Sequence, residues 1–64
     1  MTLPDLAADY FAKSDAYKAL AMAPQPTDIY ARLAHKLATD DALDAAVEAS
    51  MKLAAARKAE EEAA

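Results

Sequence analysis

Carboxylates gather at positions 40–48, where four acidic residues fall within nine. Asp40, Asp44 and Glu48 recur every four residues, and Asp41 lies beside them. On a helix this spacing places the first three on one face, where uncompensated like charges repel one another. Only Glu48 has a well-placed cation, Lys52. We call Asp40, Asp41, Asp44 and Glu48 the acidic stripe, and we predict that it either faces solvent or binds a basic partner surface.

The segment Asp40-Asp41-Ala42-Leu43-Asp44 also resembles the DDxxD motif with which isoprenoid synthases hold magnesium and a diphosphate. Those enzymes need a large helical cavity and a second metal-binding segment, and this chain supplies neither. We therefore interpret these acids as the first turn of a helix, where carboxylates complement the helix dipole. No protein family is recognised from the sequence, and no metal or cofactor is expected.

The other residues that could do chemistry do not form a catalytic set. The chain has no Cys and a single histidine, His35, whose neighbours Arg32 and Lys36 would repel a metal ion. Ser14 and Ser50 fall inside predicted helices, where a hydroxyl usually bonds to the preceding turn. Without Gly there is also no glycine-rich phosphate loop. We expect no catalytic residues and no enzymatic activity.

The aromatic residues Tyr10, Phe11, Tyr17 and Tyr30 all lie in the first half of the chain. Adjacent residues point about 100° apart on a helix, so Tyr10 and Phe11 cannot both face a narrow core. Aromatic side chains are typical anchors of protein interfaces. We predict that this aromatic set forms a partner-binding face, and the alternative is that it packs in the core.

The composition predicts an all-α fold. The 64 residues include no Gly, few β-branched residues and 20 Ala, which favours helix over strand. Because so much of the apolar content is Ala, only 16 larger apolar side chains remain to form a core. We expect one helical domain over residues 1–64, and either a marginal monomer or an oligomer.

A capping pattern and two prolines predict the first helix. Thr2 followed three residues later by Asp5 is typical of a helix start. The three-and-four spacing of apolar residues predicts a helix over about 3–22. Pro24 and Pro26 must end it, because neither can donate a backbone hydrogen bond. The linker is predicted at 23–26.

The second half of the chain allows two interpretations. Thr27 as a cap predicts a second helix over about 28–38, and Thr39 followed by two acids predicts a third helix over about 40–60. The apolar stripe of the second helix ends at Leu37. A seam of Leu43, Val47, Met51 and Ala54, with Ala46 and Leu53 beside it, begins on a shifted helix face, which favours a break. No Gly or Pro enforces a break at Thr39, so the two could be one continuous helix. The fold is therefore either a small three-helix bundle or a helical hairpin with an extended Ala-rich C-terminal helix.

Charge and hydropathy narrow the classes of function. A net charge of −4 and no clustered Lys and Arg argue against direct nucleic-acid binding. No apolar run approaches the roughly 20 residues that span a membrane, and no signal or transit peptide is expected. We therefore expect a cytoplasmic protein with no membrane partner.

The leading interpretation is a non-catalytic interaction protein: a small helical subunit, adaptor or inhibitor, of a phage or bacterial accessory type. It would dock a helical surface on a larger protein or on its own copy. One alternative is an inhibitor whose acidic stripe mimics nucleic acid. Another is a helix-turn-helix regulator or antitoxin, although its recognition helix would start with the acids at 40–44.

Overall fold

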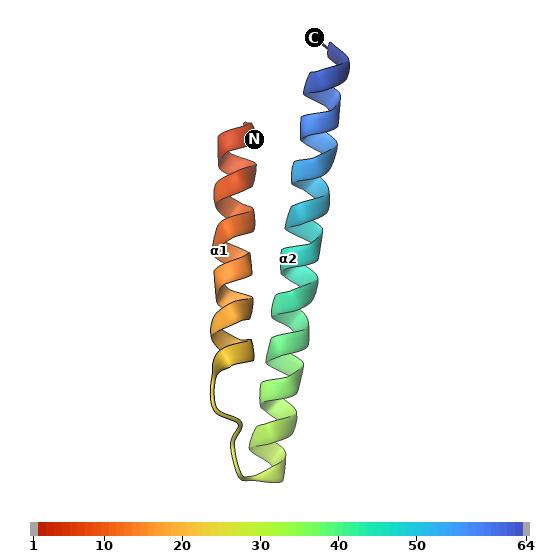
Figure 1. Cartoon of the computed structure of the whole chain (residues 1–64). Helices are drawn as coiled ribbons and strands as arrows, with labels where there is room; N and C mark the ends of the chain where they lie inside the picture. Colours follow the sequence, from red (N-terminus) through yellow and green to blue (C-terminus); the bar gives the residue numbers. More distant parts are fainter. Residues whose placement is uncertain (1, 64) are drawn as a thin grey trace.

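The computed structural model describes residues 2–63 and consists of two antiparallel helices joined by a short connection (Figure 1). Helix α1 spans Leu3–Met22 and helix α2 spans Ile29–Ala63. The start of α1 and the end of α2 lie at the same end of the hairpin, where α2 extends past α1. The Cα extents of 54 × 15 × 13 Å describe a rod, and no strand occurs within residues 2–63. The expectation of an all-α helical hairpin is confirmed.

Helix α1 covers the same residues as the predicted first helix. The hydroxyl oxygen of Thr2 accepts a hydrogen bond from the backbone N–H of Asp5 at 3.3 Å, and the Asp5 carboxylate accepts one from the backbone N–H of Thr2 at 3.3 Å. This reciprocal capping box satisfies two donors that the first turn leaves unpaired. The helix ends before Ala23, whose extended backbone leads into the prolines.

The cap of α2 is Asp28, one residue later than the sequence predicts. The Asp28 carboxylate accepts a hydrogen bond from the backbone N–H of Ala31 at 2.9 Å. The Asp28 carbonyl accepts the first bond of the helix, from the backbone N–H of Arg32, at 2.9 Å. The prediction that Thr27 caps this helix is wrong. The helix begins at Ile29, so the residue before it, Asp28, is the one whose side chain accepts from the backbone N–H three positions on.

The predicted break at Thr39 is wrong, and so is the three-helix bundle. Helix α2 is continuous over 35 residues. The hydroxyl of Thr39 donates a hydrogen bond to the backbone carbonyl of His35 at 2.8 Å, so it bonds to the preceding turn rather than capping a new helix. The Lys36 ammonium lies 3.5 Å from the Asp40 carboxylate and links the two sides of the predicted break.

Small residues of α2 form its contact with α1. Ala46 and Ala49 are 6% and 2% exposed, and they are the only buried residues within 2–63. The half-buried residues around them recur at alternating spacings of three and four, which is typical of two helices packing lengthwise. They include Leu3, Leu6, Tyr10, Tyr17 and Leu20 of α1 and Thr39, Ala42, Leu53 and Ala56 of α2.

The larger apolar residues of α2 lie outside this contact. The sequence places Leu43, Val47 and Met51 on the inner seam of a third helix, and the structure leaves all three exposed. The apolar positions move from one helix face to another between Leu37 and Leu43. This shift suggests a break only if Leu43, Val47 and Met51 face α1. Because the Ala seam faces α1 instead, one straight helix accommodates the change.

Candidate protein-binding surface

Nine large apolar side chains are exposed within residues 2–63. Two belong to α1 and seven to α2. They are Phe11, Met22, Ile29, Tyr30, Leu33, Leu37, Leu43, Val47 and Met51. Scattered exposed apolar residues are normal on proteins, whereas a contiguous group indicates a binding surface. The positions of these residues relative to the two helices therefore decide what the surface can do.

A hollow between the middles of the two helices gathers several of them. Its volume is about 350 Å³. Tyr10, Tyr17 and Lys18 contribute from α1, and Leu43 and Val47 contribute from α2. Ser14, Ala46, Ser50 and Met51 complete the lining. The hollow combines apolar walls with two tyrosine side chains, a composition typical of interface anchors and their pockets.

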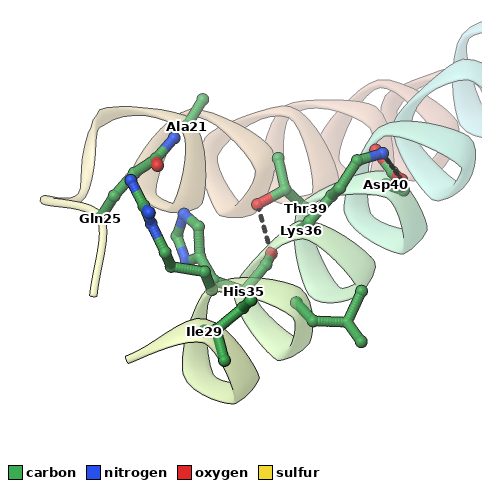
Figure 2. Close-up of a pocket in the computed structure, with 9 residues that line it drawn as sticks. Ala21, Gln25, Ile29, His35, Lys36, Thr39 and Asp40 are labelled. Carbon is green, nitrogen blue, oxygen red and sulfur yellow. Dashed lines mark hydrogen bonds and ion pairs between the residues drawn. The ribbon is translucent and has the colours of Figure 1, made fainter. Parts of the chain in front are cut away.

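A second hollow of about 570 Å³ lies toward the connection between the helices (Figure 2). Ala21 and Gln25 contribute from α1 and the connection, and the rest of the lining comes from α2, including Ile29 and Leu33. Figure 2 shows the Lys36–Asp40 ion pair and the Thr39–His35 hydrogen bond along this wall. Arg32 completes a polar rim around the apolar residues.

Both hollows lie on the same side of the hairpin. Ile29 and Lys36 line the second hollow, and Leu43 and Ser50 line the first. These residues recur every seven positions, which is close to two helical turns, so they share one face of α2. Ser14 and Ala21 show the same spacing on α1. We call the combined surface the lateral groove.

The opposite side of α2 carries small and charged residues along the middle of the helix, and two large apolar residues, Tyr30 and Leu37, toward its start. Positions nine apart point in opposite directions on a helix, at about 100° per residue. Ala34 and Lys52 therefore lie opposite Leu43, and Ala38 lies opposite Val47. Asp41 and Glu48 are exposed on this side. Tyr30 lies opposite Thr39 and Leu37 lies opposite Ala46, so these two exposed side chains also point away from the hollows. Five of the exposed large apolar residues thus line the lateral groove, and the opposite side is alanine and acid apart from Tyr30 and Leu37.

The structure separates the predicted aromatic set into two environments. Tyr10 and Tyr17 are half-buried and line the lateral groove. Phe11 is 62% exposed, and its ring lies beside that of Tyr10 with a centroid distance of 5.7 Å. Tyr30 is 81% exposed on α2, near the connection. Three of the four aromatic residues are therefore close together, and Tyr30 lies apart from them.

All four residues of the acidic stripe are exposed on α2. Asp40 pairs with Lys36 at 3.5 Å, and Glu48 pairs with Lys52 at 3.4 Å. Within residues 2–63, Asp41 and Asp44 have no ion pair. Exposed pairs of this kind contribute only a few tenths of a kcal/mol each. The lysines nevertheless cancel much of the stripe's negative charge.

Sequence reasoning missed Leu43, Val47 and Met51 as binding-surface residues, because it placed them on the apolar seam of a third helix. One signal in the sequence points to them: Ala42, Ala46, Ala49, Leu53 and Ala56 form a separate three-and-four repeat beside the larger residues. Two such repeats on one helix indicate two contact faces. The smaller one packs inside the hairpin.

The structure brings no chemical constellation together within residues 2–63. No group of three His, Asp or Glu side chains is arranged to hold a metal ion. His35 is half-buried, and its carbonyl accepts the Thr39 hydrogen bond. Neither helix, over the described residues, has the length and apolar character needed to cross a membrane.

Comparisons with protein-family models, with curated proteins and with solved structures give no match.

Proposed function

We propose that this protein is a non-catalytic protein–protein interaction module that docks through its lateral groove. One observation carries the proposal: the hairpin buries only two alanines within residues 2–63 and exposes nine large apolar side chains. Apolar burial is the dominant favourable term in folding and association. A hairpin that exposes most of its large apolar residues gains that term by covering them with another protein surface.

The exposed area supports the same proposal. The hairpin has an accessible surface of 4949 Å². A compact protein of its mass has about 3,950 Å² by the usual scaling of surface with mass. The excess of about 1,000 Å² is comparable to the roughly 800 Å² that each partner buries in a standard interface. The hairpin therefore carries enough surplus surface for a specific complex.

The two alternative functions have less support. A nucleic-acid mimic needs uncompensated negative charge, and Lys36 and Lys52 pair with two of the four stripe residues. A helix-turn-helix motif needs a turn between its helices, and α2 continues through Thr39 without one. The interaction module needs neither feature, because it uses the lateral groove.

Site-specific photo-crosslinking in cells tests the proposal. A photoreactive amino acid replaces Val47 in the groove, and a matched variant carries it at Ala38, on the opposite side of the same helix. We expect a discrete protein adduct from position 47 and none from position 38. Equal labelling from both positions, or no adduct from position 47, would contradict the proposal.

A further inference from the structure

We propose that the lateral groove is occupied by the lateral groove of a second copy of this chain, so that two hairpins form a four-helix bundle. This inference rests on the proposed function and names the partner for the same surface. In such a bundle α1 of each copy lies against α2 of the other, and every neighbouring pair of helices is antiparallel.

The rim of α1 carries an apolar residue and a cation seven positions apart. Lys18 lines the groove and is exposed. Phe11 precedes Lys18 by seven residues, so it shares this face of α1, and it is also exposed. Within residues 2–63, Lys18 has no ion pair. The α1 rim therefore presents an aromatic ring and an unpaired ammonium.

The rim of α2 carries the complementary pattern with the same spacing. Val47 and Met51 are exposed apolar residues. Asp40 lies seven residues before Val47, and Asp44 lies seven residues before Met51. Asp44 has no ion pair within the described residues. The α2 rim therefore presents an apolar pair and an unpaired carboxylate.

The two rims run antiparallel, and their matching residues lie at the same height along the long axis of the hairpin. Tyr10, beside Phe11, shares its hollow with Met51, and Lys18 shares it with Leu43, the neighbour of Asp44. A two-fold axis parallel to the helices keeps these heights and places the α1 rim of one copy against the α2 rim of the other. Phe11 then meets Val47 and Met51, and Lys18 meets Asp44.

This complementarity selects one arrangement among the symmetric ones. A two-fold interface is self-complementary, because the same patch meets itself. A two-fold axis perpendicular to the helices would invert the heights and bring Lys18 toward apolar side chains. The opposite side of the hairpin has Tyr30 and Leu37 near the connection and otherwise alanines and acids, so pairing it with itself would bury less apolar area and bring carboxylates together. Groove against groove, with the axis along the helices, satisfies both charge and apolar burial.

The molar mass in solution tests the second copy. Light scattering and circular dichroism are recorded over about three decades of concentration, because dimer formation is concentration-dependent. We expect twice the chain mass of 6.8 kDa at high concentration, with the mass falling toward 6.8 kDa on dilution while helical circular dichroism is retained. A species of 6.8 kDa at every concentration overturns the proposal. An adduct from position 47 to another protein would then leave the proposed function standing, and its absence would remove both.

A matched pair of substitutions tests the surface. Val47→Glu places a carboxylate in the interface, and we expect the dimer dissociation constant to rise at least about 100-fold. Ala38→Glu adds the same charge on the opposite side of α2, and we expect a change of less than about 3-fold. Equal effects of the two substitutions overturn the proposal.

A charge exchange tests the orientation and does not depend on the apolar variant folding. Lys18→Glu places like charges together at two symmetric contacts and should weaken the dimer about 10-fold. Adding Asp44→Lys reverses both charges and should restore the dissociation constant to within about 3-fold of the original. A double variant no tighter than Lys18→Glu overturns the proposal.

Discussion

Asp28 and Thr27 show how a single side chain decides where a helix begins. Both residue types are good caps, and they are adjacent in the sequence. The carboxylate of Asp28 accepts the N–H of Ala31, three residues on, which is the standard capping distance. Thr27 makes no side-chain hydrogen bond within residues 2–63.

Replacing these two residues separates their roles. We expect Asp28→Ala to lower the free energy of unfolding by about 1 kcal/mol, because a backbone donor of the first turn loses its acceptor. Thr27→Ala should change it by less than about 0.5 kcal/mol. Urea unfolding followed by circular dichroism at one fixed protein concentration measures both. A larger loss from Thr27→Ala would return the cap to the residue that the sequence pattern favours.

At the scale of elements, the Ala seam of α2 explains why α1 and α2 pack lengthwise with so little buried area. Ala46 and Ala49 lie at the contact and are buried, whereas Ala55 is exposed on the same helix. Small side chains let the two helices approach closely, and the larger residues of α1 fill the space beside them. A larger side chain in the seam would separate the helices.

Enlarging one alanine tests this packing. We expect Ala49→Leu to lower the free energy of unfolding by about 1–3 kcal/mol, because overpacking forces the helices apart. Ala55→Leu makes the same change outside the seam and should shift it by less than about 0.5 kcal/mol. Both are compared by urea unfolding at equal concentration. Stabilisation by Ala49→Leu would contradict this packing, because it would mean that an unfilled cavity lies beside Ala49.

At the scale of the whole molecule, the hairpin is a rod because, over residues 2–63, no third element folds over the two long helices. Its radius of gyration is 15.3 Å. A compact domain of this length has a value of about 11 Å, and an unfolded chain has about 24 Å. The rod shape keeps the full length of the lateral groove open on one side.

Solution scattering distinguishes these shapes. We expect the Val47→Glu variant, kept monomeric by its added charge, to give a radius of gyration near 15.3 Å while retaining helical circular dichroism. A value near about 11 Å would indicate that a third helix forms and folds back on the other two. A value near about 24 Å with lost helicity would show that the hairpin needs its partner to fold.

Local interactions explain what the sequence by itself determined. The all-α class follows from composition, and the ends of α1 follow from Thr2, Asp5 and the prolines after Met22. A cap or a proline acts within about one helical turn, so a pattern of neighbouring residues contains the whole interaction. Tyr10 and Tyr17 could be named as candidate residues because residue type and a locally predicted helix were enough to single them out.

Only the tertiary structure decided which side of α2 faces α1. The sequence offers two seams, one of alanine and one of Leu43, Val47 and Met51, and each has the spacing of a packed helix face. Close approach along the alanines wins inside the hairpin, so Thr39 stays within one helix and the larger residues form the lateral groove. That choice depends on side chains of α1 some thirty residues away along the chain, and no local pattern contains it.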